Sequence, residues 1–227
     1  METLKINDWQ CDCLSVKNSD KLVYMIYPAL VPVSESLLEK LSSTYKVSLA
    51  VIYVPADKWN DVLTPWPEPG EAKGFPPFAG EASSFLKFLT QELVPGIEKK
   101  CELAKDFQRI LVGVSLSGLF TLWEWMQCDM FTSIGSLSGS FWYPGFIEWF
   151  DNQPIPAKKG KAYFLLGEEE PKAKIKAYQS VGINTEAVVA RLKDSGINVM
   201  FEWVPGNHFS KPEHRIERAF AGLFEKM

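Results

Sequence analysis

Six short apolar runs that alternate with amphipathic helical patterns constrain the fold of this chain more than any other feature. The runs are residues 22–27, 47–54, 108–114, 131–137, 162–166 and 199–204. Apolar residues at helical spacing lie between or after them, at residues 34–45, 81–93, 119–126, 185–195 and 213–225. Continuous apolar strands that alternate with helices are typical of parallel sheets buried on both faces. The sequence therefore predicts an α/β fold with a mostly parallel central sheet and helices on both faces.

Other stretches have less regular patterns. Residues 4–16 are predicted as an N-terminal strand or hairpin arm, and a further helical stretch is expected through residues 97–103. Residues 57–80 form a long loop rich in Trp, Pro and Gly, and residues 139–160 are irregular and aromatic. Long loops inside compact domains are usually functional. No repeat or linker divides the 227 residues, so we expect a single domain over residues 1–227.

Composition and charge argue against several classes of protein. The formal net charge of −4 gives no indication of nucleic-acid binding. No apolar run is long enough to span a membrane, and the first residues lack the apolar segment of a signal peptide. The four cysteines (Cys11, Cys13, Cys101 and Cys128) lack the second pair that a zinc site requires. We therefore expect reduced thiols in a cytoplasmic protein without a bound metal.

A serine follows the third apolar run in a pattern typical of a nucleophile. Residues 113–118 read Gly-Val-Ser-Leu-Ser-Gly, between an apolar strand and an apolar helix. In a strand–turn–helix elbow the residues two positions before and after the nucleophile are small, and here they are Gly113 and Ser117, the latter in place of the commoner glycine. We predict Ser115 as the nucleophile and the N–H of Leu116 as an oxyanion donor. An ordinary strand-to-helix turn is the alternative.

A serine nucleophile needs a base that works near neutral pH, and the chain contains only two histidines. His208 lies in the loop after the last strand, and open α/β sheets place their chemistry in loops at the carboxyl ends of parallel strands. His214 lies among the charged residues of the last helix, which is typical of a solvated side chain. We therefore predict His208 as the base.

A histidine base is normally oriented by a carboxylate, which in this fold class lies between the serine and the histidine in the chain. Glu168, Glu169 and Glu170 follow the fifth apolar run directly. Neighbouring side chains diverge in an extended loop, so one or two of the three at most can face the histidine. Three solvated loop carboxylates, or a Ser–His pair without an acid, are the alternatives.

These motifs resemble the esterase D and enterochelin-esterase-like family of α/β hydrolases. The resemblance covers most of the chain and rests on residues 61–65 (DVLTP), 113–120 (GVSLSGLF), 136–142 (SLSGSFW) and 206–208 (GNH). It implies an α/β-hydrolase fold without a large cap domain, and hydrolysis of carboxylic esters. Glu170 is the first choice for the acid because the spacing from Gly167 to Glu170 is similar to the acid segment of that family.

The same resemblance implies a second oxyanion donor in the loop after residues 22–27. Pro28 has no N–H group, so Ala29 or Leu30 would have to donate.

The aromatic residues of the two irregular stretches are candidates for the walls of a substrate pocket. Trp59, Trp142 and Tyr143 are the predicted substrate contacts, and packing in the core is the alternative for each. An uncapped aromatic cleft suits small or extended acyl esters. Neither stretch is rich in Arg or Lys, which argues against a multiply anionic substrate.

Together these features predict a serine carboxylic-ester hydrolase for a small-molecule ester. Ser115, His208 and Glu170 act through an acyl-enzyme, without a cofactor, a nucleic-acid partner or a membrane. An acyltransferase with the same three residues, a catalytically silent binding protein on this scaffold, and a peptidase are the alternatives.

Overall fold

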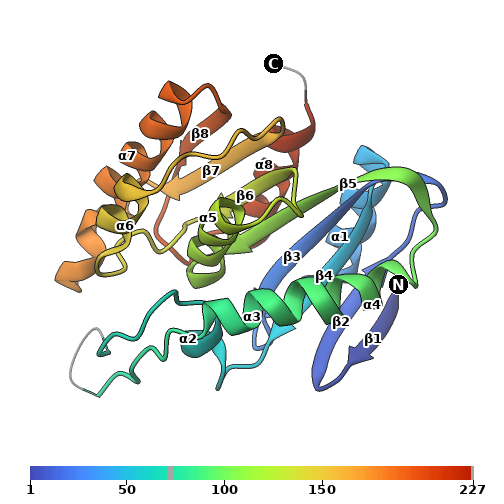
Figure 1. Cartoon of the computed structure of the whole chain (residues 1–227), viewed down its shortest axis with the longest axis horizontal. Helices are drawn as coiled ribbons and strands as arrows, with labels where there is room; N and C mark the ends of the chain where they lie inside the picture. The colour runs from blue at the N-terminus through green and yellow to red at the C-terminus, as the bar shows by residue number, and fades with distance from the viewer. Residues whose placement is uncertain (71–73, 226–227) are drawn as a thin grey trace.

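The computed structural model describes residues 1–70 and 74–225, and its centre is an eight-stranded sheet (Figure 1). The strand order is β1-β2-β4-β3-β5-β6-β7-β8. Strands β3 to β8 are mutually parallel, whereas β1 and β2 form an antiparallel hairpin at one edge. The strands are β1 Glu2–Ile6, β2 Trp9–Leu14, β3 Ser19–Pro28, β4 Ser48–Val54, β5 Leu103–Val114, β6 Ser133–Leu137, β7 Lys161–Gly167 and β8 Asn198–Val204. The predicted mostly parallel sheet and its N-terminal hairpin arm are confirmed.

Helices cover both faces of this sheet, because side chains along each parallel strand alternate between two buried layers (Figure 1). In β3, Val23 and Met25 pack toward the layer formed by α1 and α8, while Tyr24 and Ile26 pack toward the layer of α3, α5 and α7. The α-helices are α1 Glu35–Tyr45, α2 Trp59–Val62, α3 Ala82–Phe88, α4 Val94–Glu98, α5 Leu116–Gln127, α6 Phe146–Asn152, α7 Val181–Asp194 and α8 Pro212–Phe224. The other helical turns are the π-helical η1 Leu89–Leu93 and the 3₁₀-helical η2 Glu170–Lys172 and η3 Lys176–Ser180.

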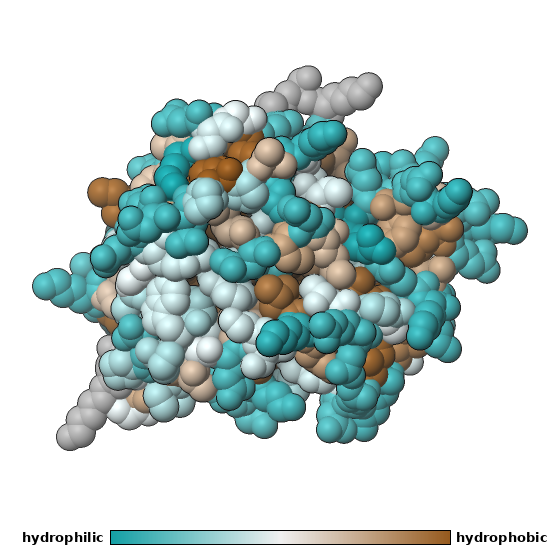
Figure 2. All heavy atoms as spheres, viewed as in Figure 1, coloured by the Kyte–Doolittle hydropathy of each residue, from teal (hydrophilic) through white to brown (hydrophobic). Residues whose placement is uncertain are grey.

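The outer surface is more hydrophilic than these buried layers (Figure 2). Figure 2 shows one side of the molecule covered mainly by hydrophilic residues, with small and separate hydrophobic patches. No helix within residues 1–70 and 74–225 combines the length and the apolar character needed to cross a bilayer.

Some boundaries differ from those expected. Strand β5 begins at Leu103 rather than at residue 108, so the helix expected through residues 97–103 is wrong beyond Glu98. The preceding helical segment runs without a break from α3 through the π-helical turn η1 into α4, and Pro95 lies in the first turn of α4, directly after η1. Helix α1 begins after Ser34 as predicted, and the Ser34 hydroxyl caps it by accepting from the Leu37 N–H at 3.4 Å.

The stretch 139–160, expected to be irregular, contains α6. Gly145 precedes this helix with φ at +74°, a conformation that favours glycine and turns the chain into the helix. Phe146 and Phe150 lie one helical turn apart and are both buried. The stretch also contacts the long loop after β4, because the Trp66 indole N–H donates to the Pro144 carbonyl at 3.0 Å. The two aromatic segments therefore pack against each other at the carboxyl edge of the sheet.

Candidate active site

Ser115 occupies a strained turn between β5 and α5. Its backbone has φ of 59° and ψ of −123°, a region that non-glycine residues rarely adopt. A Cβ atom on Gly113 would lie 2.1 Å from the carbonyl oxygen of Ser117, so strand and helix approach too closely there for any side chain. These features are those of a nucleophile elbow.

Ser117 stands where a glycine is commoner, and its hydroxyl is used inside this turn. It accepts from the Val114 N–H at 2.8 Å and donates to the Ile26 carbonyl at 2.7 Å. The side chain is fully buried, and both bonds satisfy its polar group. The serine therefore ties the elbow to β3 instead of disturbing it.

The structure brings Ser115, His208 and Glu170 together in one hydrogen-bonded chain. The Nε2 atom of His208 lies 3.1 Å from the Ser115 Oγ, and its Nδ1 atom lies 2.8 Å from the Glu170 Oε2. Ser115 follows β5, Glu170 follows β7 and His208 follows β8, so all three lie at the carboxyl ends of parallel strands. His214 is elsewhere, half exposed on α8 and 3.8 Å from Glu217.

Among the three consecutive glutamates only Glu170 is buried, with 4% of its side chain exposed, whereas Glu168 and Glu169 are exposed. The Oε1 atom of Glu170 accepts from the Gly167 N–H and from the Ser138 hydroxyl, each at 2.8 Å. Burial alone would raise the pKa of Glu170. Hydrogen bonding and charge from His208, then the hydrogen bonds from Arg215 and the Gly167 N–H, outweigh burial and lower that pKa below its ordinary value. The carboxylate is thus kept ionised opposite the imidazole.

Two residues of this network were not predicted as site residues. Arg215 on α8 is buried, and its Nη1 donates to the Glu170 Oε1 at 2.8 Å and also to the Ser138 hydroxyl. Ser138, directly after β6, has φ of 50° and is buried. In the sequence Arg215 stands in a charged helix beside His214, a context that indicates a solvated side chain. Its burial depends on how α8 packs, which no local pattern specifies.

Of the predicted oxyanion donors, Leu116 lies at the cavity and Ala29 does not. The Leu116 N–H is at the first position of α5, where the helix offers it no acceptor. The Ala29 N–H donates to the Val54 carbonyl at 3.0 Å, because the parallel pairing of β3 with β4 continues to the end of both strands. Leu30 points into solvent and does not line the cavity. Ala29 is therefore not available as a donor.

A cavity of about 880 Å³ opens beside Ser115, Leu116 and His208. Trp59 and Trp142, two of the three predicted substrate contacts, line it. Tyr143 does not line it: the side chain is buried, its hydroxyl donates to the Trp66 carbonyl at 2.6 Å, and its ring meets Phe78 edge-on at 5.3 Å between centroids. Consecutive side chains of this turn point in different directions, which places Trp142 at the cavity and Tyr143 in the core.

A third wall of the cavity comes from residues 172–181, a segment not predicted to contribute. It contains Tyr178, whose ring lies 4.4 Å from that of Trp142 between centroids. It also brings Lys172 and Lys174 to the cavity. The cavity is therefore lined in part by basic residues even though the two aromatic stretches contain few of them. Phe75 and Phe209 stand at the mouth, and Phe209 is 86% exposed.

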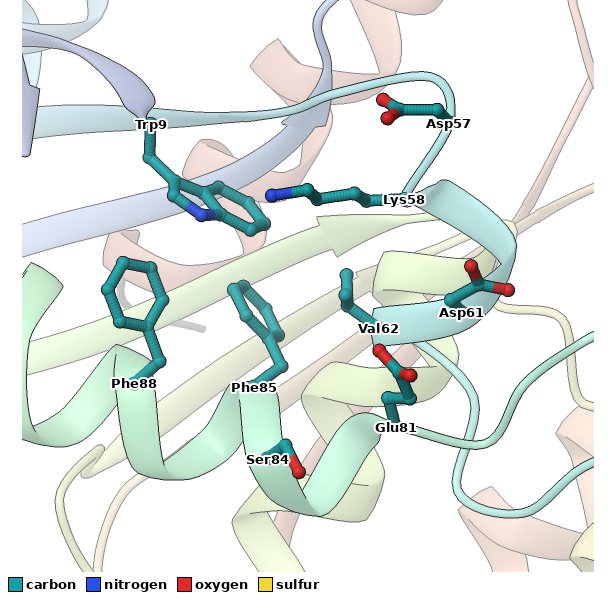
Figure 3. Close-up of a pocket in the computed structure, with 9 residues that line it drawn as sticks. All are labelled: Trp9, Asp57, Lys58, Asp61, Val62, Glu81, Ser84, Phe85 and Phe88. Carbon is teal, nitrogen blue, oxygen red and sulfur yellow. The ribbon is translucent and has the colours of Figure 1, made fainter. Parts of the chain in front are cut away.

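A second cavity, of about 410 Å³, lies between β2, the start of α2 and α3 (Figure 3). Trp9, Phe85 and Phe88 form its aromatic side, and the Lys58 ammonium lies 5.7 Å from the centroid of the Trp9 ring. Ser84 is its only hydroxyl among the described lining residues, and no histidine accompanies it. The described lining of this cavity therefore lacks a serine–histidine pair like that of the first cavity. In the described parts of the chain no cluster of three or more His, Cys, Asp or Glu side chains is arranged to hold a metal.

Known proteins match this chain in family and in fold. The family model described as "Putative esterase" matches residues 28–193. The uncharacterized protein YbbA of Bacillus subtilis (strain 168) is 27% identical over 168 residues, which cover 71% of this chain and 67% of YbbA.

Solved structures show the same fold at low identity. An IroE-like serine hydrolase from Shewanella oneidensis superposes with a TM-score of 0.73 at 16% identity, over 95% of this chain and 75% of that one. The siderophore hydrolase EstB of Aspergillus nidulans gives a TM-score of 0.73 at 18% identity, over 99% and 94% of the two chains. The chain therefore has the α/β-hydrolase fold, belongs to the "Putative esterase" family and is an enzyme that hydrolyses esters.

Proposed function

We propose that residues 1–227 form one catalytic domain that hydrolyses carboxylic esters through Ser115, His208 and Glu170. The observation that carries this proposal is the continuous chain of hydrogen bonds from the Ser115 Oγ through the imidazole of His208 to Glu170. A serine on a strained elbow, a histidine within reach and a buried carboxylate behind it are the parts that acyl transfer requires.

In the proposed reaction the Ser115 Oγ attacks the ester carbonyl carbon while its proton passes to the Nε2 of His208. The tetrahedral intermediate collapses, the bond from carbon to the leaving oxygen breaks, and the imidazolium gives its proton to the departing alcohol. Water then attacks the acyl-enzyme, His208 accepts a proton from that water, and the same proton returns to Ser115 when the acid leaves. Glu170 holds the ring in the tautomer that presents Nε2 to the serine.

The Leu116 N–H is proposed to stabilise the oxyanion. This N–H lies at the first residue of α5, where it has no helical acceptor and where the positive end of the helix dipole favours negative charge. Ala29 has no part in this step, since its N–H is already bonded.

We propose an ester with an apolar or aromatic acyl part as the substrate class. Trp59, Trp142 and Tyr178 offer flat apolar walls to such a group. Lys172 and Lys174 at the third wall allow the substrate to carry a negative group as well. The Aspergillus nidulans relative is named as a siderophore hydrolase, which is compatible with a substrate of this kind.

The test is an activity screen with p-nitrophenyl acyl esters, run beside Ser115→Ala, together with labelling by a fluorophosphonate. We expect ester turnover, labelling of Ser115 in the folded protein, and a loss of roughly 10³-fold or more in kcat for the variant. Product analysis with added alcohols separates transfer to water from transfer to another acceptor. A folded protein without any adduct on Ser115 would exclude the proposed mechanism.

A further inference from the structure

Arg215 joins all the loops that carry the acid and the base. Its Nη1 donates to the Glu170 Oε1 at 2.8 Å and to the Ser138 hydroxyl, which binds the same carboxylate oxygen. Its Nη2 donates to the Asn207 carbonyl at 2.5 Å, and its Nε donates to the Ser210 carbonyl at 2.9 Å. The last two carbonyls lie on either side of His208 in the chain.

We propose that Arg215 is a positioning residue that fixes His208 relative to Glu170 and sets the pH range over which the His208–Glu170 pair works as a base. This inference rests on the proposed function of Ser115, His208 and Glu170. Arg215 does not itself line the large cavity; its guanidinium binds Glu170, Ser138 and the Asn207 carbonyl, which belong to residues that do.

The geometric part of the inference follows from which segments the guanidinium connects. Glu170 comes from the loop after β7, Ser138 from the loop after β6, and the two carbonyls from the loop after β8. One planar group with a fixed fork of donors therefore orients the acid and the histidine loop together. Outside the contacts of His208 with Ser115 and Glu170, the loop is held at Gly206, whose carbonyl accepts from the Glu169 N–H at 3.1 Å. The side chain of Asn207 bonds within the loop, and Phe209 is exposed.

The electrostatic part follows from burial. The side chains of Arg215 and Glu170 are 3% and 4% exposed, so solvent screens their interaction weakly. The guanidinium binds Oε1, and the imidazole binds Oε2 of the same carboxylate. The hydrogen bond from Arg215 helps to hold the pKa of Glu170 below its ordinary value, so its removal should let the His208–Glu170 pair take up a proton at higher pH.

The other charged groups of the cavity lining are more exposed to solvent than Arg215 and Glu170 are. Besides Glu170, the charged residues of the cavity lining are Glu169, Lys172 and Lys174, and all three are exposed. Screening by water and salt reduces their influence on the imidazole. Of the charged groups named here, Arg215 and Glu170 are the two that are buried, so water and salt screen their charges least.

The experiment compares Arg215→Met, Arg215→Lys and Arg218→Met. Arg218 is a matched control, because it lies on the same helix and loses an ion pair with Glu202 at 2.6 Å, away from the catalytic residues. For each variant we would measure kcat and KM for a p-nitrophenyl ester across pH, with the thermal midpoint as a check of folding.

For Arg215→Met we expect kcat to fall at least about 10-fold with a smaller change in KM, and the acidic limb of the kcat/KM profile to move to higher pH by roughly half a unit or more. For Arg215→Lys we expect a lower kcat with the acidic limb near its original place, since the charge remains and the fork of donors is lost. Arg218→Met should keep both the wild-type kcat and the wild-type profile.

An acidic limb that stays in place in a folded Arg215→Met protein would overturn the electrostatic part, and a wild-type kcat in Arg215→Lys would overturn the geometric part. If Arg215→Met does not fold, Arg215→Gln replaces it for the pH profile and the lysine variant still tests the geometry. Failure of the proposed function is separate, because it would appear as undiminished turnover by Ser115→Ala in the wild-type Arg215 background.

Discussion

The Oγ of Ser115 and the Nε2 of His208 lie 3.1 Å apart although the two residues belong to strand ends separated by β6 and β7 in the sheet. The strained elbow places the serine at the end of β5, and the loop after β8 places the imidazole next to it. Glu170, from the strand next to β8, completes the contact from behind.

The first prediction separates the two histidines. His208→Ala should lower kcat/KM by roughly 10³-fold or more, because no other described side chain within reach of the Ser115 Oγ can accept its proton. His214→Ala should stay within a factor of about two, since this side chain is exposed and its Nδ1 lies 3.8 Å from the carboxylate of Glu217, away from Ser115. Steady-state kinetics with one ester would check both. Equal losses in the two variants would contradict the assignment.

The second prediction concerns Glu170 and acid stability. The pKa of Glu170 is lowered in the folded state, so its interactions stabilise the protein above the pKa of an unfolded glutamate, about 4.3, and this contribution is lost as pH falls through the folded value. Glu170→Gln should therefore unfold at a lower denaturant concentration than wild type at neutral pH, and this difference should shrink in acid. Glu168→Gln, a neighbouring exposed glutamate, is the control and should show no such pH-dependent difference.

The third prediction tests the cavity walls. Trp142→Ala should reduce kcat/KM for an aromatic or long-chain acyl ester by roughly 10-fold or more, because a large apolar contact is lost, and should affect an acetyl ester less. Tyr143→Phe is the neighbouring control. It removes the bond to the Trp66 carbonyl, should lower the free energy of unfolding by about 1 kcal/mol, and should leave the acyl preference unchanged.

The fourth prediction concerns a buried carboxyl group that takes no part in the proposed mechanism. Glu124 on α5 is fully buried, its Oε2 has no hydrogen-bond partner among the described residues, and burial raises its pKa to about 8. The unfolded state releases this proton at lower pH than the folded state does, so the stability of the wild type should fall as pH rises from about 4.5 to about 8. Glu124→Gln should remove that fall.

Thermal midpoints of Glu124→Gln and wild type at about pH 5 and about pH 9 would measure this effect. The variant should gain on the wild type only at the higher pH. An identical difference at both pH values would show that Glu124 does not change its ionisation in this range.

The sheet could be predicted well because the apolar pattern that indicates a buried strand lies within the strand itself. Parallel strands buried on both faces are continuous apolar runs, and each of the six predicted strands overlaps a strand in the structure. The capping of α1 by the Ser34 hydroxyl could likewise be predicted, since an N-cap depends on residues close together in the sequence. Helix α6 was missed because its apolar face begins only after the turn at Gly145.

The positions of Ser115, His208 and the acidic segment at strand ends were determined by the sequence, because the order of strands and loops along a chain places those ends at one edge of a parallel sheet. Only the tertiary structure decided which glutamate faces the imidazole, that the N–H of Ala29 is already bonded, that Tyr143 turns into the core, and that Arg215 is buried under the site. Each of these depends on the direction of one side chain or one N–H relative to elements far away in the chain. Such directions are set by long-range packing, which a local pattern of residues does not encode.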